Sequence, residues 1–257
     1  MRGLATARAH RPGTAAAWGA VLLLLPRTAG ASGPAGTLAA REAETSLTPV
    51  GAGYYHHTVR MDPLSAGFKA ATFTQDQYFV EMAREIFGWG GFFRAGGATF
   101  SDEDSSGEKR FDEGAVPFVA AGFRYLAPLS DDGATLLVGT TRFSYTFRYD
   151  GTDRKDPADP VPDKAEVKDF WGVETTAALQ HRFGSLVVFG GPAVQFYRLK
   201  VVRTEAASVT VESSYDTASN LFGVVGGFRV DLGRVTLQTE AQQFETLSYG
   251  GTLSYRF

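Results

Sequence analysis

Residues 248–257 read SYGGTLSYRF, and this short stretch decides the fold class of the whole chain. Its apolar positions are Tyr249, Leu253, Tyr255 and Phe257, whereas serine, threonine and arginine occupy most of the alternate positions. Successive side chains of a β-strand point to opposite faces, so the stretch predicts a strand with one apolar and one polar face. Soluble domains usually finish in a frayed polar tail. A chain that finishes inside such a strand indicates that this strand closes a β-barrel.

The same kind of strand recurs upstream of this stretch. From Gly88 onward, alternating strand-like runs are separated in turn by long polar loops and by tight turns, and we expect eight strands over residues 88–257. Short turns on one side and long loops on the other are typical of transmembrane barrels. The sequence therefore predicts an all-β fold, namely an antiparallel up-and-down β-barrel that spans a membrane.

Aromatic residues gather toward the two ends of the predicted apolar faces. Two aromatic girdles, a membrane thickness apart, are typical of barrels that are anchored at lipid headgroups. The expected outer girdle contains Tyr145, Phe147, Tyr149, Phe170 and Trp171, and the expected inner girdle contains Phe123, Tyr125, Phe183, Tyr255 and Phe257. Residues 186–201 break the alternation, and the sequence leaves the lipid-facing side of this strand open.

The N-terminal region has the composition of a secretory signal peptide. Arg2, Arg8 and Arg11 precede an apolar run, and Ala29-Gly30-Ala31 offers a cleavage site made of small residues. We therefore expect residues 1–31 to be removed on export, and they are excluded from the predicted fold.

Residues 32–87 are interpreted as an N-terminal arm. A capping box that begins at Thr74 predicts a short amphipathic helix over residues 75–87, with apolar residues at helical spacing (Tyr78, Met82 and Ile86). An alternative stays open, because AGFKAATF also has the composition of a strand. Strands at 66–74 and 77–86 would add a hairpin and make a ten-stranded barrel.

Net charge and cysteine content exclude several classes of function. The formal net charge is −3 at pH 7, which gives no indication of a nucleic-acid partner. The chain has no cysteine, so disulfide bonds and thiolate metal sites are excluded. No cofactor is expected, because no cofactor-binding motif stands in the sequence.

The C-terminal stretch resembles the insertion signal of bacterial outer-membrane β-barrel proteins. The residues that carry the resemblance are Ser248, Gly250, Leu253, Tyr255 and Phe257. The layout of residues 88–257 resembles that of the small, eight-stranded barrels of the OmpA/OmpX type. The resemblance implies a location in the outer membrane of a Gram-negative-type envelope after cleavage of the signal peptide. It also implies recognition by the barrel-assembly machinery and contact with outer-membrane lipid and lipopolysaccharide.

Charged residues on the polar faces of the predicted strands are candidates for the barrel lumen. Eight strands enclose a space just wide enough to be filled by side chains. Because buried charges need partners, Glu174, Asp231 and Glu240 are each expected to be shared among guanidinium groups. Such a network would plug the barrel, whereas a narrow anion-preferring channel is the alternative. The predicted network comprises Arg94, Arg124, Arg142, Arg148, Glu174, Arg182, Arg229, Asp231, Glu240 and Arg256.

One predicted loop, DEDSSGEKRFDE, has the spacing of a calcium-binding loop. Its candidate ligands stand at positions 1, 3, 5 and 12 around a glycine at position 6. The flanking segments are predicted strands rather than helices, so a solvated acidic hairpin is the alternative. The candidate ligands are Asp102, Asp104, Ser106 and Glu113, with Gly107 at the turn.

No group of residues has the spacing of a known catalytic motif. A hydrolase of the serine type needs a hydroxyl and a histidine that a carboxylate orients. The histidines beyond the signal peptide are His56 and His57, in the arm, and His181, at the predicted inner rim. We therefore expect a barrel without catalysis, either structural or presenting surface loops to an extracellular partner. A small pore or transporter is the first alternative, and a lipid-modifying enzyme is the second.

Overall fold

The computed structural model describes residues 50–64, 70–86, 89–103, 114–153, 163–204, 210–217 and 221–256. These ranges form antiparallel strands and contain no helix that is long and apolar enough to cross a membrane. The strands are β1 (Val50–Pro63), β2 (Ala71–Ile86), β3 (Trp89–Glu103), β4 (Val116–Pro128), β5 (Thr135–Thr146), β6 (Tyr149–Asp153), β7 (Asp163–Phe183), β8 (Leu186–Thr204), β9 (Thr210–Asp216), β10 (Phe222–Leu232), β11 (Val235–Gln243) and β12 (Leu247–Tyr255).

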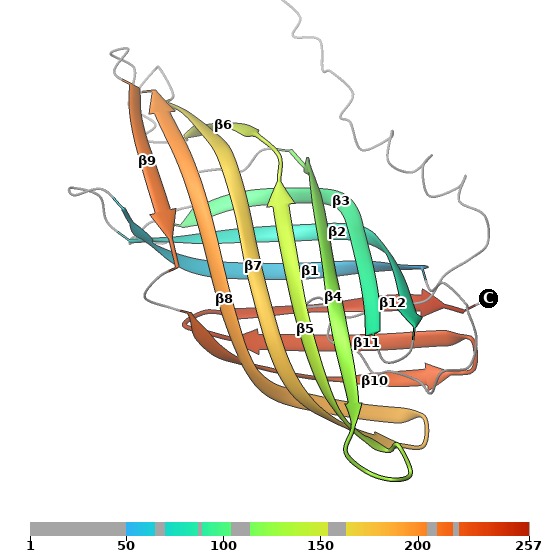
Figure 1. Cartoon of the computed structure of the whole chain (residues 1–257). Coiled ribbons are helices and arrows are strands. Elements are labelled where there is room, and N and C mark those ends of the chain that lie inside the picture. The colour runs from blue at the N-terminus through green and yellow to red at the C-terminus, as the bar shows by residue number, and fades with distance from the viewer. Residues whose placement is uncertain are drawn as a thin grey trace, which may run out of the picture.

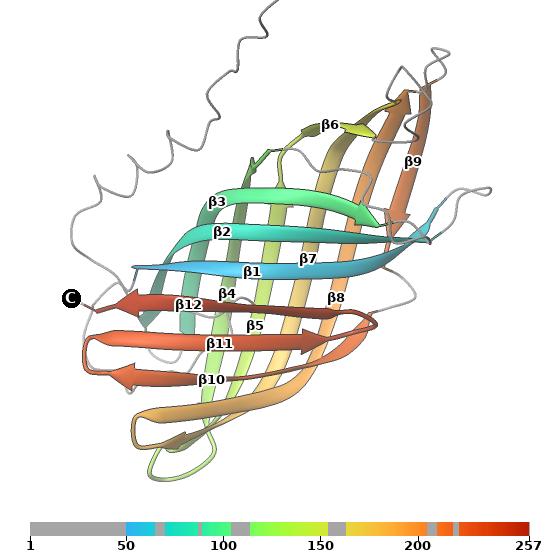
Figure 2. The same ribbon diagram turned by 180° about the vertical axis from the view of Figure 1, so that it is seen from behind.

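Ten of these strands, all except the short β6 and β9, close into a barrel. Each long strand pairs with the next one along the chain, and β12 returns to pair with β1 from Val50 opposite Tyr255 to His56 opposite Tyr249. Figure 1 shows the long β7 and β8 on one wall, and Figure 2 shows β10, β11, β12, β1 and β2 side by side on the opposite wall. The short β6 pairs with the start of β7. The short β9 pairs antiparallel with the end of β8 and also with the end of β1. The prediction of an all-β antiparallel barrel is confirmed.

Two predictions are corrected by β1 and β2, namely the count of eight strands and the N-terminal helix. The predicted helix over residues 75–87 is not formed, because residues 71–86 are the strand β2. The ten-strand alternative had the right number, but its second strand (77–86) and the end of its first (71–74) belong to one strand, β2, whose hairpin partner is β1. The helical spacing misled for a simple reason: residues four apart share a face in a strand as well as in a helix.

The barrel has two unlike ends. Tight connections join β4 to β5, β7 to β8 and β10 to β11 at one end, where β1 begins and β12 finishes; we call this the turn end. Gly133, Gly184 and Gly233 lie in these turns with positive φ, which side chains with a Cβ rarely adopt. In the first turn, the Ser130 hydroxyl and the Ala134 amide donate to Asp132, and these bonds lower the pKa of its carboxyl. The opposite end, with β6, β9 and the longer connections, is the loop end.

Candidate functional site

The outer surface of the barrel is apolar, and the inner surface is largely polar. Phe222 is 78% exposed and Leu232 is 63% exposed, whereas Arg94 is fully buried. On β8, Leu186, Val188 and Val194 point outward. This identifies the outer face of the strand, which the sequence pattern of residues 186–201 had left undecided. A soluble barrel has the opposite distribution, so this surface calls for an apolar environment or a partner.

Aromatic rings mark both ends of the outer surface. At the turn end, Trp89 and Tyr125 lie 4.7 Å apart between ring centroids, and Phe123, Phe183 and Tyr255 are also exposed. Toward the loop end, Tyr54 and Tyr78 lie 5.1 Å apart, with Tyr249 exposed nearby on β12. Exposed aromatic residues therefore form a band at each end of the apolar surface.

Two residues of the expected outer girdle lie inside the barrel instead. Phe170 and Tyr149 are each 2% exposed. Phe170 shares its parity with the inward-facing Glu174, so it could not stand on the same face as Trp171. Tyr149 turns inward because Phe147 and Arg148 interrupt the strand between β5 and β6, and the alternation restarts after them.

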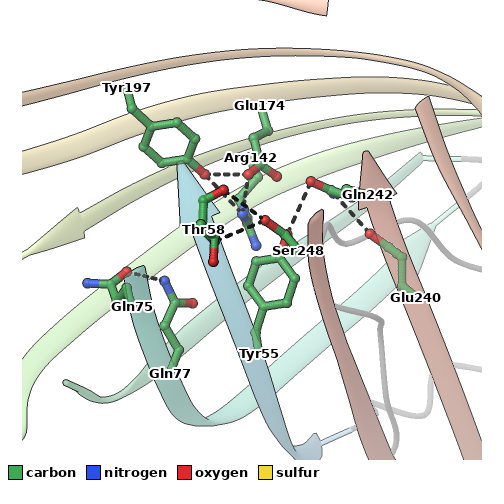
Figure 3. Close-up of polar contacts among 10 residues, drawn as sticks. All are labelled: Tyr55, Thr58, Gln75, Gln77, Arg142, Glu174, Tyr197, Glu240, Gln242 and Ser248. Carbon is green, nitrogen blue, oxygen red and sulfur yellow. Dashed lines mark hydrogen bonds and ion pairs between the residues drawn. The ribbon is translucent and has the colours of Figure 1, made fainter. Parts of the chain in front are cut away.

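An ion pair projects into the lumen from the wall that β5 and β7 form. The Arg142 guanidinium on β5 lies 2.7 Å from the Glu174 carboxylate on β7 and donates to the Tyr197 hydroxyl at 3.3 Å. Tyr197, on β8, donates its own hydroxyl proton to Glu174. Figure 3 shows these three side chains meeting in the lumen, with Arg142 over the ring of Tyr55 at 5.4 Å. A charged centre held by three neighbouring strands thus occupies the lumen.

Further hydrogen bonds join Tyr55, which contacts Arg142 of this centre, to residues on the opposite wall. The Tyr55 hydroxyl on β1 donates to Gln242 on β11 at 3.1 Å. The Gln242 amide donates in turn to Glu240 at 3.0 Å, as Figure 3 shows. All three residues are buried. The polar contacts therefore span the interior from β5, β7 and β8 to β1 and β11.

Two further charged groups stand on other strands, one on β2 and β3 and one on β10 and the end of the chain after β12. Arg94 Nε donates to Glu81 at 2.5 Å, and both side chains are completely buried. The Arg94 guanidinium also lies 4.7 Å from the centroid of the Phe79 ring. Near the turn end, Asp231 is shared by Arg229 at 2.7 Å and Arg256 at 2.5 Å. Glu81 thus pairs with one guanidinium group and Asp231 with two.

The structure places the predicted lumen residues as follows. Arg94, Arg124, Arg142, Glu174, Arg229 and Glu240 are buried, and Arg182, Asp231 and Arg256 are half-buried. Asp231 is shared between two arginines, whereas Glu174 takes one arginine and one tyrosine, and Glu240 accepts from a glutamine. Arg148 is a correction: its side chain is 63% exposed and contacts Asp150 and Glu166, because the strand is interrupted at this residue.

Several residues that line the lumen were not among those predicted from the sequence. Glu81, Gln75, Gln77 and His57 are buried in the lumen, but they stand in the segment interpreted as an arm. Tyr197 was overlooked because tyrosine fits an apolar face as well as a polar one. The period-two alternation of residues 73–83 was the signal that could have revealed β2 and its lumen face.

Apolar side chains fill the interior at the loop end. This group, the loop-end cluster, packs ring against ring: Phe170 lies 5.1 Å from Phe100 and 5.5 Å from Tyr197, and Phe73 lies 5.5 Å from Tyr215. Its members are Val59, Met61, Phe73, Phe100, Tyr149, Val167, Phe170, Tyr197, Leu199, Val201 and Tyr215. Since Tyr197 also belongs to the charged centre, the two layers are continuous.

The structure describes only some residues of the predicted calcium loop and of the predicted insertion signal. Asp104, Ser106 and Glu113 of the calcium loop lie outside the described residues, and Asp102 is in β3. The part of the chain that the structure describes contains no cluster of three potential metal ligands. Of the residues that resemble an insertion signal, Ser248, Gly250, Leu253 and Tyr255 belong to β12, and Phe257 lies outside the described residues.

The three histidines that the structure describes have different surroundings. His57 is buried in the lumen, with the ring centroids of Tyr55 and Tyr197 at 5.7 Å and 4.6 Å. At the turn end, His181 shares a hydrogen bond of 2.8 Å with Thr135. His56 is on the outer surface and contacts Asp76. Of these three residues, His56 is the one in contact with a carboxylate in the described structure.

No protein-family model matches the chain, and no curated protein is similar to it in sequence.

Proposed function

We propose that this chain is an outer-membrane β-barrel protein whose lumen is closed, and which acts through its outer surface and its loop end. The observation that carries the proposal is the inside-out distribution of side chains: exposed phenylalanine and leucine outside, buried arginine and glutamate inside. The resemblance of residues 248–257 to an outer-membrane insertion signal supports the same location.

The energetics of the outer surface favour a bilayer over water. Burying apolar surface is worth about 25 cal/mol per Å², and side chains such as Phe222, Phe183 and Leu253 each leave much of their surface uncovered. Closure is the second support, because a barrel whose first and last strands pair leaves no open sheet edge in the hydrocarbon. The aromatic bands at both ends have the arrangement that headgroup anchoring requires.

The filled lumen favours a non-conducting barrel over a pore. The charged centre around Arg142 and Glu174 crosses the interior, and the loop-end cluster packs rings beyond it. An ion would have to displace both layers to pass. We therefore propose a structural or surface-presenting role, with the loop end facing the exterior and available to an extracellular partner or to lipopolysaccharide.

Fractionation and heating test the location and the barrel together. The full-length protein is expressed in a Gram-negative host, and outer-membrane fractions are run on SDS gels with and without boiling. We expect the protein in that fraction, and a band that shifts on boiling, because a closed barrel has no strand edge from which to unzip. A protein found only in the soluble periplasmic fraction, with no shift, would contradict the proposal.

Planar-bilayer recording separates the closed barrel from the pore alternative. With the heat-shifting form in the bilayer, we expect no unit conductance steps. Regular steps that disappear when the protein is left out would replace the closed-barrel proposal by a pore, while leaving the outer-membrane location intact.

A further inference from the structure

A polar group interrupts the outer surface just beyond the aromatic band at the loop end. Along the outer faces of β1 and β2, the exposed Ala52 and Met82 are followed by the paired rings of Tyr54 and Tyr78. The next outward positions on these strands are His56 and Asp76, which are register partners, and then Thr58 and Thr74, which are also partners. Polar residues thus stand directly beyond the rings that would mark the headgroup level.

Asp76, His56 and Thr58 form a hydrogen-bonded chain, and the Tyr54 hydroxyl also donates to Asp76 Oδ1. His56 Nδ1 lies 2.8 Å from Asp76 Oδ1, and His56 Nε2 lies 3.2 Å from Thr58 Oγ1. The strand register creates both contacts: Asp76 is directly opposite His56 on β2, and Thr58 is two residues further along β1 on the same face.

A carboxylate, an imidazole and a hydroxyl follow one another in this group, which is the order that activates a hydroxyl as a nucleophile. A carboxylate that accepts the Nδ1–H of a neutral imidazole leaves the Nε2 lone pair free to accept a proton. That lone pair faces the Thr58 hydroxyl, so His56 can act as its base, as in enzymes with a hydroxyl nucleophile. His181, by contrast, contacts a threonine through Nδ1 and stacks on Phe183, and His57 is enclosed in the lumen.

The Thr58 backbone is held from the other side by β12. Its amide donates to the Ser248 hydroxyl at 3.1 Å, and its carbonyl accepts from the Thr246 hydroxyl at 2.5 Å. Figure 3 shows Thr58 next to Ser248, where the β1–β12 ladder has already finished. The His56 ring stacks on Tyr249 of β12 with centroids 4.9 Å apart. Thr58 and His56 are therefore both held in place by the closure of the barrel.

The group is also accessible from outside. The side chains of His56 and Asp76 are 25% and 35% exposed. The Thr74 hydroxyl, 3.4 Å from Thr58 Oγ1, is a second hydroxyl at this group. Below the group lies the apolar surface of Tyr78 and Met82, along which an acyl chain can extend.

We propose that Thr58, His56 and Asp76 form a hydrolytic site for acyl esters of membrane lipids, a proposal that rests on the membrane insertion proposed above. Thr58 Oγ attacks the ester carbonyl while its proton passes to His56 Nε2. The C–O bond to the lipid alcohol breaks, and that alcohol leaves with the proton from His56. Water then attacks the acyl-threonine and gives a proton to His56. The bond between the acyl carbon and Thr58 Oγ breaks, His56 returns the proton to Thr58 Oγ, and the carboxylic acid is released. Asp76 is a positioning residue that holds the Nδ1–H tautomer.

The substrate class follows from the height of the group on the barrel. An ester linkage of a membrane lipid lies between its acyl chain and its headgroup, which is the level between Tyr78 and the polar residues beyond it. A phospholipid and the lipid part of lipopolysaccharide share this linkage. Phosphatidylethanolamine vesicles and purified lipopolysaccharide micelles, offered separately, distinguish the two sources.

Hydrolysis is tested with the full-length protein in its heat-shifting form. Release of fatty acid is measured from both lipids, and p-nitrophenyl palmitate in mixed micelles provides a generic ester. We expect turnover of the generic ester and of one lipid, with a loss of at least about 100-fold in Thr58→Val and His56→Ala. In Asp76→Asn, kcat is expected to fall with little change in KM, because the amide favours the wrong tautomer.

Thr141→Val is the matched control. Thr141 also faces outward and contacts another threonine, Thr175, at 3.2 Å, so the same substitution is made in a similar setting on β5. A heat-shifting wild-type protein that turns over none of the three substrates overturns the hydrolytic site and leaves the barrel proposal standing. Turnover that Thr58→Val and Thr141→Val retain equally overturns it as well. Failure of the heat shift itself would instead contradict the proposed function.

Discussion

At the scale of single residues, burial makes the pairing of charges inside the barrel obligatory. Glu81 and Arg94 have no exposed side-chain surface, and Arg94 lies over the Phe79 ring. Removing one member of a buried ion pair costs more than the pair itself contributes, because the other charge stays desolvated. The stability of the lumen therefore depends on keeping or removing both charges together.

Glu81→Gln is expected to destabilise the barrel by about 3–5 kcal/mol, because Arg94 loses this carboxylate while it stays buried. Equilibrium unfolding by urea in detergent micelles, followed by tryptophan fluorescence, measures the loss. The double substitution Glu81→Gln with Arg94→Gln is the control and is expected to recover most of it. A single variant within about 0.5 kcal/mol of wild type, the range of a neutral surface change, would contradict the argument.

At the scale of elements, close contact between strands sets what each position tolerates. A Cβ added to Gly96 on β3 would lie 1.9 Å from the backbone oxygen of Tyr78 on β2, which is a severe overlap. At the next residue, Gly97, the nearest atom would be the Ala115 Cβ at 3.4 Å, an ordinary contact. Two adjacent glycines in one strand are therefore expected to respond differently to the same methyl group.

Gly96→Ala is expected to destabilise the protein by about 1–3 kcal/mol, because the β2–β3 ladder must move to admit the methyl group. The temperature at which the folded band disappears on SDS gels, together with the urea midpoint, measures this change. Gly97→Ala serves as the matched control and should stay near wild type. Equal midpoints for the two variants would mean that the strands are not so closely packed at Gly96.

At the scale of the whole molecule, pairing of β1 with β12 turns a sheet into a barrel. Ala52 is opposite Leu253 in this pairing, and both side chains are exposed on the outer face. Leu253 is in turn opposite Leu237 on β11. Since neighbouring strands are about 4.8 Å apart, β1 and β11 are separated by about twice that spacing.

Cysteine cross-linking tests the closure directly, because the chain has no cysteine of its own. The pair Ala52→Cys with Leu253→Cys should form a disulfide on mild oxidation, since register partners fall within the Cα separation that a disulfide allows. The bond is detected as a reductant-sensitive change of mobility in boiled samples. Ala52→Cys with Leu237→Cys is the control, and efficient cross-linking of that pair instead would show that the register is wrong.

The sequence by itself determined the class of fold and much of the lumen. Alternation with period two is a local property, and it is readable in β5, β7, β11 and β12 without knowledge of their partners. The inward positions of Arg142 and Glu174 follow from it, since both stand on the polar parity of their strands. The same reasoning failed at Arg148 and Tyr149, because a break in the strand resets the parity, and the sequence does not mark that break.

Only the tertiary structure decided what the N-terminal segment does. In β2, the spacing of Tyr78, Met82 and Ile86 fits a helix and a strand equally, and pairing with β1 and β3 selects the strand. With β1 and β2 included, the barrel has ten strands where eight were predicted. The same pairing places Asp76 opposite His56, and β12 pairs with the other edge of β1. Contacts between residues far apart in the chain depend on register, which is set when the strands meet and cannot be read from either strand alone.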